Sequence, residues 1–196
     1  MSFRIEQKIL IGKNQIIEFK NLYQKKKLKK LYPQRVIKSL YFEDLNYNMY
    51  KDSVEGVLPR KKIRIRNYPN EDGNKFYLEK KISSFEGRYK EKKKISISEY
   101  NKILKSGIYD YDYGYCKPLL YVEYKRNYYI LDQSRVTHDT QIKYYKFKNK
   151  IIKKDENDIF EIKTHSKADL DELFLTFPMD RTRFSKYCNG FDKLFT

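Results

Sequence analysis

Charged and apolar residues alternate along five segments of the chain. The charged positions are Arg4, Glu6 and Lys8; Arg60, Lys62, Arg64 and Arg66; Glu79 and Lys81; Lys90, Lys92 and Lys94; and Glu161 and Lys163. A β-strand sends residues i and i+2 to the same face, so each segment predicts a strand with one charged face and one apolar face. Such cationic faces would repel one another across an open sheet. The pattern therefore predicts a closed, basic cavity for a polyphosphorylated ligand.

The same periodicities predict the remaining elements. Strands are expected at 3–11, 35–42, 58–68, 75–82, 88–97, 119–131, 135–147 and 158–164. Helices are expected from Asn14 into the lysine run 25–30, closed by Pro33; at 44–53, stopped by Gly56; from a Ser98 cap to Gly107; at 168–177; and at 182–195. Residues 109–115 read as a tyrosine-rich loop, and 148–157 as a polar hairpin tip. The short turns between strands predict antiparallel pairing.

This order of elements predicts the fold class. Antiparallel strands with helices at both ends and between hairpins are typical of an α+β domain. Closing the sheet into a barrel would remove its edges and turn the charged faces inward. We therefore expect a closed antiparallel barrel with flanking helices, in a single domain that spans residues 1–196.

Composition points to phosphate-bearing partners. The chain has 43 Lys and Arg against 26 Asp and Glu, a net charge of +17. Lys, Ile, Asn and Tyr are all abundant, which is the bias of an AT-rich coding sequence. This bias works against arginine, so arginine is a better marker of binding than lysine. Cys116 and Cys188 have no disulfide or zinc spacing, and two reduced structural thiols are expected. With no apolar run of about 18–20 residues, we expect a soluble, cytoplasmic protein.

Eight short motifs occur in a characteristic order. They are Arg4-x-Glu6-x-Lys8, Ser39-Leu40-Tyr41-Phe42-Glu43, Arg64-x-Arg66-x-Tyr68, Leu78-Glu79-Lys80-Lys81, Tyr124-Lys125-Arg126, Arg135-x-Thr137-x-Asp139, Phe160-Glu161-Ile162-Lys163 and Phe184-Ser185-Lys186-Tyr187. Together they resemble the VTC domain, the polyphosphate polymerase domain of the vacuolar transporter chaperone family. That domain belongs to the triphosphate tunnel metalloenzymes, which are related to the CYTH group.

The resemblance implies an eight-stranded antiparallel tunnel that binds a triphosphate with a divalent metal, Mn²⁺ or Mg²⁺. It implies an ATP-dependent polymerase that transfers the γ-phosphate of ATP to inorganic polyphosphate. The catalytic phosphate contacts that it implies are Lys8, Arg64, Arg66, Lys81, Arg126 and Lys186. Further phosphate-binding positions are Arg4, Lys90, Lys92, Arg135 and Lys163, and Glu161 would hold the metal. An arginine guanidinium can bind two phosphate oxygens at once, and carboxylates are ligands for hard cations.

Three points of the pattern stay open. The first motif has Arg4 where CYTH tunnel enzymes have a glutamate, which removes one metal carboxylate and favours the VTC branch. The register of the run 90–94 is ambiguous. Glu6 or Glu79 could neighbour Glu161, or could instead be ion-pair partners that hold arginines in place. His138 and His165 are not expected to act as general bases, because His138 faces away from the charged side.

Several functions are compatible with these residues. A triphosphate or polyphosphate hydrolase would use the same site with water as the acceptor. A non-catalytic polyphosphate-binding module would need only the basic residues. A nucleic-acid binder is the alternative from charge alone, but its cations would spread over one exposed surface with aromatic platforms. We therefore expect no nucleic-acid partner, and any membrane translocation would belong to another chain.

Overall fold

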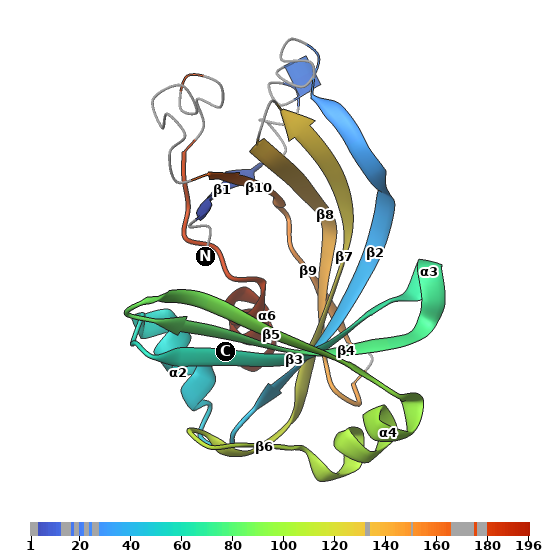
Figure 1. Ribbon diagram of the computed structural model, residues 1–196, viewed down its shortest axis with the longest axis vertical. Helices are drawn as coiled ribbons and strands as arrows, with labels where there is room; N and C mark the ends of the chain where they lie inside the picture. The colour runs from blue at the N-terminus through green and yellow to red at the C-terminus, as the bar shows by residue number, and fades with distance from the viewer. Residues whose placement is uncertain are drawn as a thin grey trace. The chain divides into compact units, whose positions relative to one another are not determined.

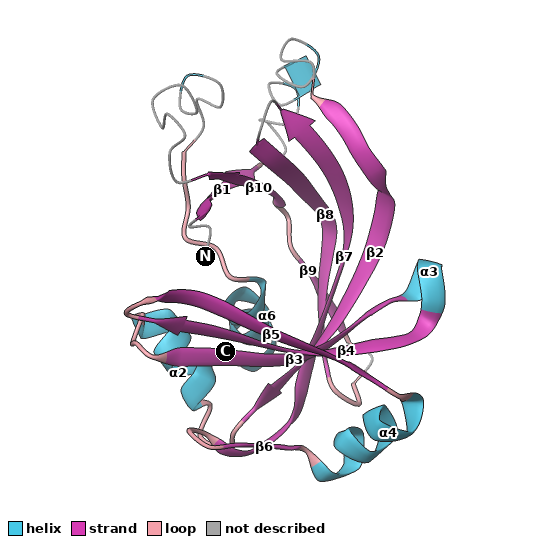
Figure 2. Ribbon diagram, viewed as in Figure 1, coloured by secondary structure: helices cyan, strands magenta, loops and turns pink. Residues whose placement is uncertain are grey.

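The computed structural model describes residues 4–12, 17, 20, 21, 24, 28–131, 134–149, 151–165, 175 and 180–196 (Figure 1). The strands in this part of the chain are β1 (Arg4–Ile11), β2 (Lys29–Glu43), β3 (Arg60–Tyr68), β4 (Gly73–Ser84), β5 (Gly87–Ile95), β6 (Ile108–Asp110), β7 (Gly114–Leu131), β8 (Ser134–Lys146), β9 (Ile152–Lys154) and β10 (Asp158–His165). The helices are α2 (Asn48–Glu55), α3 (Pro69–Asp72), α4 (Ile97–Ser106) and α6 (Lys186–Phe195) (Figure 2). The α+β class is confirmed, and none of the described helices has the length and apolar character that a membrane span needs.

The strands form one sheet with two ends. Its order is β1-β10-β8-β7-β2-β3-β4-β5, with β6 paired to β7 and β9 paired to β8. The sheet is therefore not closed, and the predicted closed barrel is wrong. Each edge is protected in another way. The segment before α6 lies along β1, where Ile9 bridges Arg181, and β5 is an exposed, lysine-rich strand of the kind that resists further pairing.

The chain divides into two compact units. The first unit holds residues 1–35, 124–142 and 155–184, and the second holds 36–123, 143–154 and 185–196. The long strands β2, β7 and β8 contribute to both units. Whether the chain folds as a single domain stays a prediction.

The predicted alternation of faces is confirmed in both units. In the first, the core contains Ile9, Ile11, Leu28, Val136, Phe160 and Ile162. In the second, it contains Leu40, Phe42, Met49, Ile63, Ile65, Phe76, Ile95 and Cys116, with residues of α4 packed against it. Burial of these side chains is the main driving force that fixes which face of each strand turns inward. The charged residues that alternate with these apolar positions consequently share the opposite face.

Several predicted helix boundaries are wrong. Pro33 does not close a helix, because it lies inside β2. Most of the predicted helix from Asn14 falls outside the described residues. The predicted helix at 168–177 also falls outside them, apart from Leu175. Ser96, not Ser98, caps α4, and its hydroxyl accepts a hydrogen bond from the Glu99 amide. Ser96 is the N-cap because its backbone is extended, as an N-cap residue requires, and its hydroxyl reaches the amide three residues later.

The other two predicted helices begin later than expected, α2 at Asn48 and not at 44, and α6 at Lys186 and not at 182, whereas the predicted helix ends hold. Gly56 and Gly107 end α2 and α4 with positive φ, as predicted. A Cβ at Gly107 would lie 2.5 Å from the Cys116 carbonyl oxygen, so this position requires glycine. In α2, Met49 is buried, whereas Leu45 precedes the helix and is 85% exposed.

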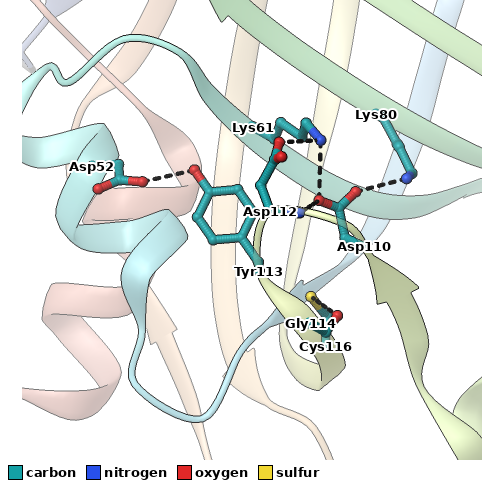
Figure 3. A network of polar contacts seen from close by, with 8 residues as sticks. All are labelled: Asp52, Lys61, Lys80, Asp110, Asp112, Tyr113, Gly114 and Cys116. Carbon is teal, nitrogen blue, oxygen red and sulfur yellow. Dashed lines mark hydrogen bonds and ion pairs between the residues drawn. The ribbon is translucent and has the colours of Figure 1, made fainter.

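The tyrosine-rich segment forms a hairpin of β6 and β7 around residues 111–113, not the loop that we expected. Figure 3 shows the contacts that hold it. Asp110 is fully buried and accepts hydrogen bonds from Lys61 Nζ at 3.1 Å and Lys80 Nζ at 2.7 Å, while Tyr113 donates to Asp52 at 2.7 Å. These lysines lie on the core side of β3 and β4. Their charge is neutralised within the protein, so they are structural.

Candidate functional site: two basic strand faces

The first group of candidate residues lies on one face of β3, β4 and β5. Strand pairing places Lys62 opposite Lys81, Arg64 opposite Glu79, Lys81 opposite Lys90, and Glu79 opposite Lys92. Opposite residues in an antiparallel pair point to the same side. We call this set the β3–β5 basic face; its cations include Lys62, Arg64, Arg66, Lys81, Lys90, Lys92 and Lys94. The pairing also resolves the register of 90–94, because Lys93 points to the other side and pairs with Glu99.

Glu79 lies at the centre of this face. Arg64 Nε and Nη2 lie 2.8 and 2.7 Å from Glu79 Oε2, and Lys90 Nζ lies 2.6 Å from Oε1. Burial would raise the pKa of Glu79, but Arg66, Arg64 and Lys90 outweigh it and lower the pKa to about 2. Glu79 is therefore ionised, and it fixes Arg64 and Lys90 in place. One carboxylate among several cations leaves the face strongly positive.

Two residues of β2 hold the arginines from the other side. Arg64 Nη1 donates to Tyr41 Oη at 2.9 Å, and Arg66 Nε donates to Ser39 Oγ at 3.2 Å. Burial opposes ionisation of Tyr41, but the positive charges of Arg64, Arg66 and Lys62 lower its pKa below the ordinary value. Tyr41 is thus a buried acceptor that fixes the direction of the Arg64 guanidinium.

Lys186 begins α6, next to the same face. Its neighbour Ser185 caps the helix, and Lys62 Nζ donates to Ser185 Oγ at 2.9 Å. Tyr187 stacks on Tyr41, with ring centroids 4.9 Å apart. These contacts join the start of α6 to β2 and β3. Further along the helix, Gly190 lets α6 pack closely on β8, because a Cβ there would lie 2.6 Å from the Tyr144 ring.

The second group lies in the other unit, on β1, β10 and β8. Strand pairing places Lys8 opposite Glu161, Glu6 opposite Lys163, and Lys163 opposite Arg135. Lys163 Nζ lies 2.8 Å from Glu161 Oε1 and 3.5 Å from Glu6 Oε2, so both carboxylates share one ammonium. Glu6 thus lies beside Glu161, with Lys163 between them. Glu79 has the ion-pairing role that we considered for both carboxylates, since it pairs with Arg64 and Lys90.

Glu161 is almost fully buried among cations. Burial would raise its pKa, but Arg126, Lys163 and Lys8 together lower the pKa to about 2. Arg126 makes two parallel hydrogen bonds to the buried Asp139, at 2.5 and 2.7 Å. Lys8 Nζ donates to the Phe184 carbonyl oxygen at 2.8 Å. The group therefore has fixed side chains and an ionised carboxylate.

The structure places every predicted site residue on a strand or at a helix start, and it divides them between the two units. Arg64, Arg66, Lys81, Lys90, Lys92 and Lys186 lie in the second unit; Arg4, Lys8, Arg126, Arg135, Glu161 and Lys163 lie in the first. Four further residues hold or extend the two groups without having been predicted as site residues: Lys62, Tyr41, Ser39 and Asp139. All four stand in the alternating segment or the motifs, so period-2 spacing was the signal that could have found them.

Few groups in the described residues resemble a metal centre. No cluster of three or more His, Cys, Asp or Glu side chains occurs there. Glu6 and Glu161 place two carboxylates around one ammonium group, that of Lys163. His138 lies 3.0 Å from Asp158 and is paired with Phe160, a core residue, so it faces away from Glu161 as expected. The side chain of His165 lies outside the described residues.

Several solved structures resemble this chain in fold. A candidate adenylate cyclase from Bacillus halodurans has 17% identity and a TM-score of 0.63, covering 100% of this chain and 98% of its own. A conserved hypothetical protein from Pyrococcus furiosus has 16% identity and a TM-score of 0.60, with 95% and 99% covered. A candidate adenylyl cyclase from Hippeastrum with a dominant triphosphatase activity has 13% identity and a TM-score of 0.56, with 99% and 98% covered.

At these identities the structural neighbours show a shared fold. No curated protein matches the sequence. The family model of the VTC domain, however, matches residues 3–195, which is nearly the whole chain. The match confirms the resemblance that the eight motifs indicate. The chain belongs to the VTC domain family.

Proposed function

We propose that this chain is a polyphosphate polymerase, which binds ATP through its basic strand faces and transfers the γ-phosphate to an inorganic polyphosphate chain. The observation that carries the proposal is the β3–β5 basic face. Its central carboxylate, Glu79, is already neutralised by Arg64 and Lys90. Lys62, Arg66, Lys81, Lys92 and Lys94 add further positive charge on the same face, and a linear polyanion supplies negative charge at that spacing.

The fixed arginines support phosphoryl transfer. This reaction needs positioning and charge neutralisation more than a covalent nucleophile. Arg64 is held by Glu79 and Tyr41, and Arg66 by Ser39, so little rotamer freedom is lost when phosphate oxygens bind. Lys62, Lys81, Lys90, Lys92 and Lys186 add cations around them. Lys8, Arg4, Arg126, Arg135 and Lys163 are proposed phosphate contacts of the other unit.

A divalent metal, Mn²⁺ or Mg²⁺, is part of the proposal. Glu161 and Glu6 fit such an ion, because Glu161 is ionised and both offer hard oxygen ligands within reach of one lysine. The ion would neutralise charge on the phosphate oxygens during transfer. Lys163 would then bind phosphate oxygens in place of its present carboxylate partners.

A triphosphate hydrolase is the second candidate. The observation in its favour is the shared fold with the Hippeastrum protein that has a dominant triphosphatase activity. A non-catalytic polyphosphate-binding module is a third candidate. It would need no metal ligand, so the ionised Glu161 argues against it. Alternating cations on strand faces disfavour a nucleic-acid partner. We propose that the protein acts in the cytoplasm, where ATP is available. Any translocation of polyphosphate across a membrane would be carried out by another chain, a membrane protein.

Product analysis tests the proposal. The pure protein is incubated with ATP and Mn²⁺ or Mg²⁺, and the products are separated on a gel. We expect long polyphosphate, with one ADP formed for each phosphate incorporated and little orthophosphate. High salt should slow the reaction because it screens contacts with the polyanion. Orthophosphate as the main product, with no extended chain at any ATP concentration, would establish the hydrolase instead.

A further inference from the structure

An aromatic and cationic cluster lies on β2 and β7 of the first unit, beside Arg126. The Tyr32 and Tyr128 rings meet edge to face, with centroids 5.8 Å apart and planes at 81°. The Arg35 guanidinium carbon lies 5.7 Å from the Tyr32 centroid and 5.6 Å from the Tyr128 centroid. We call these three residues the Tyr32 platform. Aromatic rings and a guanidinium are planar groups of the kind on which flat, aromatic ligands stack.

The platform lies on the side of β7 that carries the phosphate-site candidates. Tyr129 and Leu131 pack against the core of the first unit. Tyr128 and Arg126 are at the alternate positions of the same strand, so they share the opposite face. Two residues along a strand span about 7 Å. A ligand bound at Arg126 through its phosphates could therefore reach the Tyr128 ring with a group attached to them.

The platform is also open to solvent. Tyr32 is 47% exposed, and Tyr128 and Arg35 are half-buried. Core aromatic residues of this protein are nearly inaccessible, as Tyr144 and Phe160 are. Burial in the core therefore does not explain why three planar groups are assembled here. Asn127, which stands between Arg126 and Tyr128 in β7 and bonds to Gln34 at 3.2 Å, belongs to the other side of that strand.

We propose that the Tyr32 platform binds the nucleobase of the nucleoside triphosphate substrate. This inference rests on the proposed function, which supplies a triphosphate near Arg126. The base would stack on an exposed tyrosine ring, with the Arg35 guanidinium beside it. Every base presents a π-face, so this recognition distinguishes a nucleoside triphosphate from inorganic phosphate chains but discriminates weakly among bases. It would let the enzyme take ATP as donor in the presence of polyphosphate.

The test compares two ligands on matched variants. Binding of ATP and of inorganic tripolyphosphate is measured by calorimetry without metal, on the wild type and on the double variant Tyr32→Leu/Tyr128→Leu. We expect the variant to lose about 5- to 100-fold in ATP affinity, the range for loss of a base stack, and to keep its tripolyphosphate affinity. GTP should lose affinity like ATP. Arg35→Lys, which keeps the charge but not the plane, should show a smaller loss of the same kind.

The β6–β7 hairpin provides the matched control. Tyr109 and Tyr115 are also exposed and in edge contact, but they pair within the β6–β7 hairpin, where no proposed phosphate contact lies, so Tyr109→Leu/Tyr115→Leu should bind both ligands like the wild type. If the Tyr32 double variant is unfolded by circular dichroism, the Arg35→Lys variant decides the question. Unchanged ATP affinity with normal tripolyphosphate binding would overturn the platform alone. Failure of the wild type to bind tripolyphosphate would overturn the proposed function, and the platform with it.

Discussion

Arg64 and Glu79 face each other on adjacent strands, with Arg64 Nε and Nη2 at 2.8 and 2.7 Å from the same carboxylate oxygen. The carboxylate is 1% exposed, and Lys90 binds its other oxygen. This arrangement holds a guanidinium on a rigid strand while its Nη1 contacts Tyr41. An arginine fixed in this way can bind phosphate without losing much side-chain freedom, so Glu79 organises the basic face.

Replacing Glu79 by glutamine should destabilise the protein. The change leaves Arg64, Arg66 and Lys90 close together without their shared counter-charge, and loss of one partner of a buried ion pair costs about 3 kcal/mol. A bound polyanion would supply the missing charge, so tripolyphosphate should raise the melting temperature more in Glu79→Gln than in the wild type. Thermal unfolding with and without tripolyphosphate measures both effects.

Glu91→Gln is the control for this variant, since Glu91 is exposed and points to the other side of β5. It should change neither the free energy of unfolding nor the response to tripolyphosphate. An equal response of Glu79→Gln and the wild type to tripolyphosphate would contradict a phosphate-binding role for this face.

Acid should destabilise the protein through two carboxyl groups. The pKa values of Glu79 and Glu161 are both about 2 in the folded protein, against 4.5 as the ordinary value. The unfolded chain therefore takes up protons first as the pH falls. The stabilisation is fully present above about pH 4.5 and is lost towards pH 2, on the order of 3 kcal/mol for each group. Urea unfolding at pH 5 and at pH 3 measures the loss.

The same titration in Glu79→Gln separates this group from the others. The variant should lose less free energy of unfolding between pH 5 and pH 3 than the wild type does. Parallel curves for the two proteins would mean that Glu79 is not ionised at low pH in the fold.

The arginine pair should dominate triphosphate affinity. We expect Arg64→Ala/Arg66→Ala to weaken tripolyphosphate binding by about 3 kcal/mol or more, because two charge-assisted contacts are lost. Lys90 remains beside Glu79, so the double variant should fold. Calorimetric titration measures the affinity, and Lys93→Ala, which removes a cation from the other face of β5, should leave it unchanged. Wild-type affinity in the folded double variant would remove the phosphate site from this face.

Glu161 should be needed for turnover rather than for binding. Glu161→Gln keeps the shape of the side chain but removes the charge that would hold the metal. Polyphosphate synthesis from ATP should collapse in this variant, whereas metal-free tripolyphosphate binding should persist or tighten as the surroundings become more positive. Glu6→Gln is the comparison for the second carboxylate. Full activity of Glu161→Gln with both Mn²⁺ and Mg²⁺ would show that the metal is held elsewhere.

The sequence predicted much of the fold because strand alternation is a local property. Ile63, Ile65, Phe160 and Ile162 are buried as their spacing requires, and the charged residues between them share the other face. Helix ends at Gly56 and Gly107 were also local signals, since both have positive φ. The errors arose where local signals competed. Pro33 resembles a helix stop, but β2 accommodates it.

The family and the identity of the basic strand residues were therefore determined by the sequence, through motif order and period-2 spacing. The tertiary structure decided which of these residues meet. Strand register placed Glu79 beside Arg64 and Lys90, and Glu6 beside Lys163. The sequence alone did not show which of the two basic groups each carboxylate would join. It also decided that the sheet ends at β1 and β5. Pairing and closure depend on contacts between residues far apart in the chain, and a one-dimensional pattern does not encode those distances.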